Sequence, residues 1–299
     1  MISEIISNQF TLFVLLILPI AAIAGFFAGL FGIGGGLITV PFLYFVFETL
    51  NIDSNYIMHL SVGTSFSIIV FTATASVLTH LKYKSVDLEI IKNYGIFVII
   101  GVSFGAILAA FMKTKSLLLF FSIIVYILGA YLLNLHEKTK EIKPNFTLLP
   151  KIILGFLSGF ISGPMGIGGA IINVPVLRYF GYPINKAIGS AATIGLIIAI
   201  FGALGFLITG IILKANLPLS VGFINIPAFL IFIPITTFMA RIGAKTTHKL
   251  EKYKLQRMFG IFLYIIGTVF LYRYLILWDN IFHRLFKFFD RIHQLFQFC

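Results

Sequence analysis

The stretch Gly25–Pro41, GFFAGLFGIGGGLITVP, occurs a second time in this chain as Gly159–Pro175, GFISGPMGIGGAIINVP. The two stretches align without gaps and are identical at ten of seventeen positions. Self-similarity at a fixed offset indicates a duplicated structural unit. The offset, from Gly25 to Gly159, is 134 residues and divides the chain into two halves. We therefore predict an internal duplication in which each half contains one glycine-rich break.

Apolar residues dominate the composition of the chain. Of its 299 residues, 59% are apolar or aromatic and only 11% are charged, whereas about 25% are charged in an average globular domain. A mean hydropathy of +1.05 gives more apolar surface than one water-soluble core of this size can bury. The composition predicts an all-α polytopic membrane protein and excludes a soluble enzyme.

Ten apolar runs follow one another along the chain. They cover roughly residues 10–31, 37–47, 58–79, 93–112, 116–134, 151–163, 170–180, 187–212, 221–240 and 256–276. Most are long enough for a transmembrane helix, which needs about 20 residues. Three are too short, 37–47, 151–163 and 170–180, and each lies beside a glycine-rich break. We expect each half to be a short helical hairpin, broken by glycine, followed by three transmembrane helices.

Basic residues decide between two topologies for the short pairs. The net charge of +12 comes from Lys and Arg that cluster between the apolar runs, so we interpret them as topology signals and expect no nucleic-acid partner. If each pair is a hairpin, 15 of the 22 basic residues share one face; if each pair is a single span, the split is ten against twelve. The cytoplasmic excess of Lys and Arg favours hairpins, with both termini and the loop Glu48–Tyr56 outside. Since three spans follow each hairpin, the two repeats are inverted, a pattern of secondary transporters.

Four regions result from this division. The first transmembrane repeat is 1–135, a cytoplasmic linker is 136–151, the second repeat is 152–276, and an interfacial amphipathic helix is 277–299. That last helix has one apolar face, which predicts that it lies on the membrane surface. The residues of this face are Trp278, Ile281, Phe282, Leu285, Phe289, Ile292 and Phe296. The first ten residues contain no Lys or Arg, so we expect the first run to be retained and not cleaved as a signal peptide.

The two hairpin tips are the candidate substrate site. Without a Cβ, glycine lets a ligand approach backbone N–H groups, and unwound backbone at membrane depth is tolerated only where protein or a cavity satisfies it. The helix after each tip directs the positive end of its dipole at the centre, which suits an anion. The alternative is that the glycines only allow close helix packing, which we expect for the GxxxG pairs that begin at Gly25, Gly101 and Gly159. The candidates at the tips are Gly34, Gly35, Gly36, Gly168 and Gly169.

Polar residues near the tips extend the candidate site. Thr39 and Asn173 stand at equivalent positions, each two residues before a proline, and either bind an anion or satisfy carbonyls freed at the break. A second repeated element, Gly63-Thr64-Ser65 and Gly189-Ser190-Ala191, lies early in the first long helix of each half. Its hydroxyls either face the tips or pack between helices. The polar candidates for substrate binding are Thr39, Thr64, Ser65, Asn173, Ser190 and Thr193.

Carboxylate, cysteine and HExxH patterns are missing from the apolar runs. Every Asp and Glu falls in a predicted loop, helix end or tail, which argues against a buried carboxylate relay. No HExxH motif occurs, and the single cysteine, Cys299, excludes a disulfide framework and a cysteine metal cluster. We expect no enzymatic activity, cofactor or metal site. The expected partners are a small anionic substrate and membrane lipid, with a proton or sodium as candidate coupling ions.

Five segments carry a resemblance to a known family. They are residues 29–41 (GLFGIGGGLITVP), 163–175 (GPMGIGGAIINVP), 62–65 (VGTS), 188–191 (IGSA) and the basic stretch 241–257. With these segments the chain resembles the TauE/SafE sulfite exporter family, also called the toluene-sulfonate uptake permease superfamily, over roughly residues 10–275. The positions that match the hairpin motif of the family are Gly32, Gly34, Gly35, Gly36, Pro41, Gly166, Gly168, Gly169 and Pro175. Ala170 stands where the first tip has Gly36, which is a departure from exact symmetry.

The resemblance implies a multi-pass protein of the bacterial cytoplasmic membrane that exports small sulfur-containing anions such as sulfite or organosulfonates. We therefore predict a secondary transporter that works by alternating access. Two alternatives are a passive anion channel and a membrane scaffold without transport. Saturable flux with counterflow separates a transporter from a channel, and a scaffold gives no flux.

The predicted topology can be tested by labelling with a membrane-impermeant thiol reagent. After Cys299 is replaced, a cysteine at Asn55 is expected to react in intact cells, and one at Lys140 or Lys249 only after the membrane is opened. The opposite pattern, with Lys140 labelled and the Asn55 position protected, would refute the inverted-repeat orientation.

Overall fold

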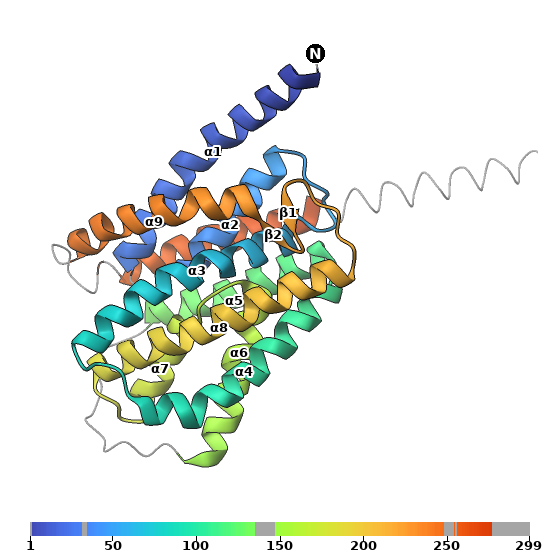
Figure 1. Ribbon diagram of the computed structural model, residues 1–299. Helices are drawn as coiled ribbons and strands as arrows, with labels where there is room; N and C mark the ends of the chain where they lie inside the picture. The colour runs from blue at the N-terminus through green and yellow to red at the C-terminus, as the bar shows by residue number, and fades with distance from the viewer. Residues whose placement is uncertain (1, 32–34, 135–146, 248–253, 255, 277–299) are drawn as a thin grey trace, which may run out of the picture.

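The computed structural model describes residues 2–31, 35–134, 147–247, 254 and 256–276 as a bundle of helices (Figure 1). The helices are α1 (Ile2–Phe31), α2 (Gly36–Thr49), α3 (Ile57–Lys82), α4 (Leu88–Phe111), α5 (Thr114–Asn134), α6 (Leu148–Met165), α7 (Ala170–Tyr179), α8 (Ile184–Ile212) and α9 (Ile226–Thr247), followed by a helix at Gln256–Ile276. Each of the ten predicted runs coincides with one helix, so the all-α fold is confirmed. The predicted amphipathic helix 277–299 lies outside the described residues.

Among the boundaries that differ from the sequence-based expectation are the starts of α9 and α6. The run 221–240 was expected to be one helix, but α9 begins only at Ile226. A two-stranded antiparallel ribbon, β1 (Ser220–Val221) and β2 (Ile224–Asn225), precedes it and turns at Gly222 with φ +56°. At the other boundary, α6 begins at Leu148, inside the range predicted as linker, because Pro150 in the first helical turn needs no hydrogen-bond acceptor for its nitrogen.

Seven helices of the described chain are long and apolar enough to cross a membrane. They are α3, α4, α5, α6, α8, the segment Ile226–Gly243 of α9, and Gln256–Ile276. At 18 residues, α6 is longer than its apolar run suggested, whereas α2 and α7 have 14 and 10 residues. The short helices are therefore the arms that follow the glycine breaks.

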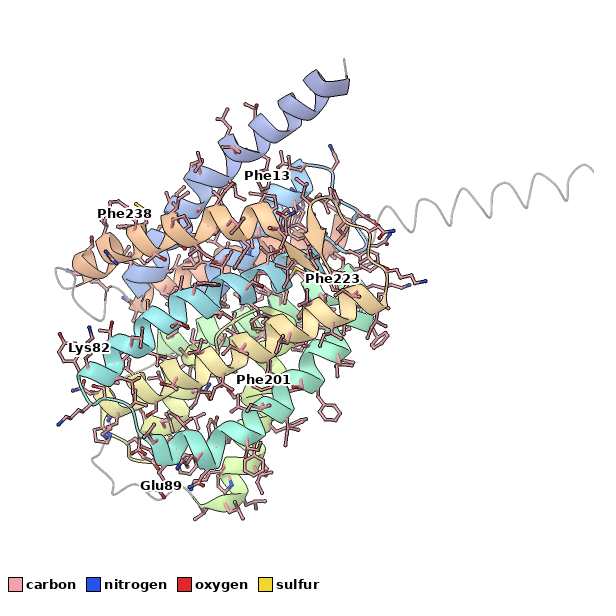
Figure 2. All side chains as sticks on the ribbon, viewed as in Figure 1. Phe13, Lys82, Glu89, Phe201, Phe223 and Phe238 are labelled. Atoms are coloured by element: carbon pink, nitrogen blue, oxygen red, sulfur yellow. The ribbon has the colours of Figure 1, made fainter. Side chains whose placement is uncertain are left out.

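The two repeats run in opposite directions. A Cβ added to Gly63 of α3 would lie 3.0 Å from Phe206 of α8, and one added to Gly202 of α8 would lie 2.7 Å from the ring of Phe66. A later residue of α3 therefore contacts an earlier residue of α8, so the two helices are antiparallel. They are the first long helices of the two repeats. Figure 2 shows Lys82 and Glu89 toward one end of the bundle and Phe223 toward the other. The predicted inverted arrangement is confirmed.

The second hairpin begins and ends at the same end of the bundle. Gly155 of α6 lies against Tyr94 and Gly163 against Ala106, so α6 runs parallel to α4. The chain then reverses, and α7 ends in a turn at the start of α4. Tyr182 in this turn lies close enough to Asp87 and Glu89 for their charges to act on it. Its pKa is raised, mainly by burial and to a smaller extent by these two carboxylates. The chain therefore returns to the face it came from.

The first hairpin is built in the same way at the opposite end. Gly25 of α1 packs on Thr236, and Gly243 packs on Phe26, so α1 runs parallel to α9. The end of α2 lies beside the end of the last helix, where Glu48 Oε2 is 3.0 Å from Arg273 Nη2. In both repeats, the first arm of the hairpin therefore packs along the second long helix of the other repeat.

Close backbone contact joins α4 to α6 through their glycines. A Cβ added to Gly101 would lie 2.1 Å from the Phe156 carbonyl oxygen, and one added to Gly159 would lie 2.2 Å from the Val98 carbonyl oxygen. Such distances are shorter than any contact between non-bonded carbon and oxygen atoms, so a side chain here would push the helices apart. The packing role expected for these GxxxG pairs is the one they have.

Substitution of these glycines tests this packing. Gly101→Ala is expected to lower the melting temperature of the detergent-purified protein, at a cost of about 1–3 kcal/mol for overpacking. Gly95→Ala, in the same helix, is the matched control because its Cβ would have its nearest neighbour, Ile197, at 3.6 Å. Equal melting temperatures for the two variants would contradict the close approach of α4 and α6.

Candidate substrate site at the hairpin tips

The second arms of the two hairpins begin with glycine in the same backbone conformation. Gly35 (φ +85°) is the N-cap of α2 and Gly169 (φ +64°) is the N-cap of α7, a left-handed conformation that glycine adopts without strain. Neither helix has a side-chain cap or an acidic residue in its first turn. The first-turn N–H groups of a helix have no acceptor within the helix itself, so both helices begin as the anion-site hypothesis requires.

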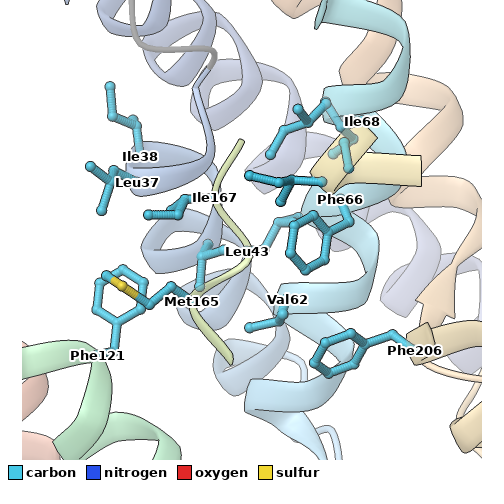
Figure 3. Close-up of a cluster of buried hydrophobic side chains, with 14 of the residues drawn as sticks. Leu37, Ile38, Leu43, Val62, Phe66, Ile68, Phe121, Met165, Ile167 and Phe206 are labelled. Carbon is cyan, nitrogen blue, oxygen red and sulfur yellow. The ribbon is translucent and has the colours of Figure 1, made fainter. Parts of the chain in front are cut away.

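The two tips lie against each other near the middle of the bundle. A Cβ added to Gly36 would lie 2.5 Å from the Gly166 carbonyl oxygen and 2.8 Å from Ile167 Cα. Figure 3 shows Ile167 between the side chains of α2 and those of α3. The structure thus brings Gly35, Gly36, Gly168 and Gly169 into one region, whereas Gly34 and Gly32 lie outside the described residues.

Close packing also contributes at these tips. A Cβ added to Gly195 of α8 would lie 2.3 Å from the Gly168 carbonyl oxygen, so α8 touches the second tip as α2 does. The hydroxyl of Ser65 of α3 donates a hydrogen bond of 3.0 Å to the Gly166 carbonyl oxygen. Of the hydroxyls predicted near the tips, Ser65 therefore does reach one, and it satisfies a carbonyl freed where α6 ends.

Thr39 and Asn173 make equivalent hydrogen bonds. Thr39 Oγ1 donates to the Gly35 carbonyl oxygen at 3.0 Å, and Asn173 Nδ2 donates to the Gly169 carbonyl oxygen at 2.9 Å. Both side chains therefore bond to the carbonyl of the N-cap glycine one turn earlier, which also accepts backbone N–H groups of its own helix. These bonds are made within the first turn of each helix and help to hold each tip in its conformation.

Asn173 is further held by two buried neighbours. Its Oδ1 accepts hydrogen bonds from the hydroxyls of Tyr94 of α4 at 2.7 Å and Ser158 of α6 at 2.8 Å. All three residues are buried. Because hydrogen bonds in an apolar interior are costly to leave unmade, this network ties the start of α7 to α4 and α6.

The hydroxyls of Thr64 and Ser190 serve a different contact. Thr64 Oγ1 accepts from the N–H of Asn225, which precedes α9, and Ser190 Oγ accepts from the N–H of Asp87, which precedes α4, both at 2.9 Å. The two bonds correspond across the repeats and link each first long helix to the other repeat. Thr193 donates to the Gly189 carbonyl oxygen of its own helix at 3.1 Å. These three residues therefore contribute to packing in this structure.

Tyr94, Ser158 and Ser162 around the second tip were not among the sequence-based candidates. A signal for the serines was present, since the aligned repeats place Ser158 opposite Ala24 and Ser162 opposite Ala28. A polar residue that aligns with alanine in the other repeat, within an apolar helix, marks a position where the two repeats have diverged. Tyr94 carried no comparable signal because its role depends on contact between helices far apart in the sequence.

Inverted repeats with glycine-broken hairpins whose tips pack against each other are the architecture of a membrane transporter. The family model described as sulfite exporter TauE/SafE matches residues 17–270, and the chain belongs to this family. It is 32% identical to a probable membrane transporter protein of Haemophilus influenzae, with 85% of this chain and 97% of that protein covered. It is 28% identical to one of Methanocaldococcus jannaschii, with 85% and 95% covered. No solved structure matches the chain significantly.

Equivalent substitutions in the two arms are expected to have unequal effects. Asn173→Leu removes three hydrogen bonds and leaves the hydroxyls of Tyr94 and Ser158 without this acceptor, at about 1–3 kcal/mol for the unsatisfied groups. Thr39→Val removes one bond within a helix and is expected to cost about 1 kcal/mol or less. Thermal unfolding of both purified variants checks the order, and a larger loss for Thr39→Val would contradict the assigned network.

Proposed function

We propose that this membrane transporter moves small sulfur-containing anions, such as sulfite or short organosulfonates, across the bacterial cytoplasmic membrane by alternating access. The observation that carries the proposal is that the N-terminus of α2 packs on Gly166 and Ile167, which lead into the N-terminus of α7, at the seam between inverted repeats. Both ends are positive and carry N–H groups, which favours an anion with several acceptor oxygens.

The distribution of charge supports the same class of substrate. Among the described residues, Asp, Glu, Lys and Arg lie in loops or within the first or last two turns of their helices. A cation at the tips would therefore meet two positive helix ends without a carboxylate partner. An anion, in contrast, would be held by dipoles and N–H groups, and we expect weak, readily reversible binding.

The arrangement of the tips is the reason for proposing alternating access and not a continuous pore. The first hairpin enters from one face and the second from the other, and they meet at one central region. Movement of one repeat against the other would open that region to each face in turn. We place both termini outside, following the cytoplasmic excess of basic residues. The choice of sulfur over phosphorus or carbon comes from family membership alone.

Flux into liposomes tests the proposal directly. Purified protein is expected to give saturable sulfite uptake that shows counterflow and is reduced by excess organosulfonate, while phosphate and acetate compete poorly. Protein-free liposomes are the control, and sulfate and thiosulfate are compared as further candidate substrates. Linear flux without counterflow would favour a channel, no flux would favour a scaffold, and a cationic substrate would show the assignment to be wrong.

A further inference from the structure

The two tips share a backbone design but differ in polarity. Around the second tip, Ser158 and Ser162 of α6 replace Ala24 and Ala28 of α1 in the aligned repeats. A similar difference occurs on the second long helices of the repeats. Asp87 and Asn225 stand at equivalent positions before α4 and α9, and seven residues further on α4 has Tyr94 where α9 has Phe232. Among the described residues, the second tip therefore has more hydroxyl groups around it than the first.

Most of these polar groups are already paired with one another. Asn173 accepts from Tyr94 and Ser158 and donates one amide hydrogen to the Gly169 carbonyl oxygen. This network fixes the first turn of α7 and uses up the hydroxyls of Tyr94 and Ser158 as donors.

Ser162 is the exception. Its side chain is fully buried, and its Oγ has no hydrogen-bond partner among the described residues. A buried hydroxyl without a partner is unfavourable and calls for an explanation, such as a ligand. The Oγ of Ser162 is directed at the start of α7, since a Cβ added to Gly169 would lie 3.2 Å from it and 2.9 Å from Asn173 Nδ2.

The start of α7 supplies further donors at the same place. The N–H groups of Ile172 and Asn173 bond to the Gly169 carbonyl oxygen, so the N–H groups of Ala170 and Ile171 before them are the first-turn donors that lack an acceptor within the helix. Gly169 has no side chain to cap them. The first turn of α7 thus offers two N–H donors next to Gly169, which Ser162 Oγ approaches, and it contains no acidic residue.

We propose that Ser162 Oγ and the first-turn N–H groups of α7 bind one oxyanion, so that the second hairpin is the binding half of the transporter. The first hairpin, with Ala28 in the place of Ser162, provides the opposing surface. The inference rests on the proposed function, because it takes the transported species to be a small oxyanion. Ile198 of α8 would lie 2.4 Å from a Cβ at Gly169 and covers this position, so admission of the anion requires α7 and α8 to separate.

The test compares Ser162→Ala with a matched control, Ser67→Ala. The control removes another buried serine hydroxyl, one that already donates to the Gly63 carbonyl oxygen in its own helix. For each purified variant, the Kd for sulfite, methanesulfonate, phosphate and acetate is measured, together with the melting temperature without ligand.

Ser162→Ala is expected to raise the Kd for sulfite about tenfold, the loss of one hydrogen bond to a charged group, without lowering the melting temperature of the ligand-free protein. Ser67→Ala is expected to leave the Kd unchanged. An unchanged Kd for Ser162→Ala, with or without a lower melting temperature, would refute the inference.

Failure of the proposed function gives a different result. If the wild type binds phosphate or acetate but not sulfite or methanesulfonate, the sulfur assignment is wrong. The Ser162 site then stands if Ser162→Ala weakens binding of the anion that does bind. If the wild type binds none of the four anions, both proposals are wrong.

Discussion

The structure depends on one constraint, which is that backbone polar groups inside a membrane must be satisfied by protein or by a ligand. A break in a helix frees N–H and carbonyl groups. At the second break, Ser65 donates to the Gly166 carbonyl oxygen, and Asn173 adds a side-chain bond to that of Gly169. The first N–H groups of α2 and α7 lack an acceptor within their own helices, and their position makes the tips the centre of the proposed site.

The same constraint explains why the two repeats form one unit. Thr64 accepts from the N–H of Asn225 and Ser190 from that of Asp87, so each first long helix completes the hydrogen bonding at the start of a helix in the other repeat. The hairpin arms are exchanged similarly, α1 along α9 and α6 along α4. Neither repeat could satisfy its own backbone alone. Motion between them must therefore preserve or replace these contacts.

Within this symmetric frame, the tips have become different. The first is lined by alanine and Thr39, and the second by serines and Asn173. An exact duplicate would present two equal half-sites, whereas this chain concentrates its hydroxyls beside α7. Such asymmetry suits a transporter in which one hairpin holds the anion and the other closes over it.

The sequence by itself determined the ten helices, the duplication and the positions of the glycine breaks, because hydropathy over about 20 residues and a gapless repeat are local properties of the chain. It also indicated the inverted topology through the placement of Lys and Arg. Only the tertiary structure decided that Thr64 and Ser190 link the repeats, that Ser65 reaches the opposite tip, and that the Ser162 hydroxyl has no partner in the described part of the chain. Each of these depends on which helices touch at a distance of roughly 100 residues or more along the chain, or on which neighbours a side chain lacks, and neither is encoded in local periodicity.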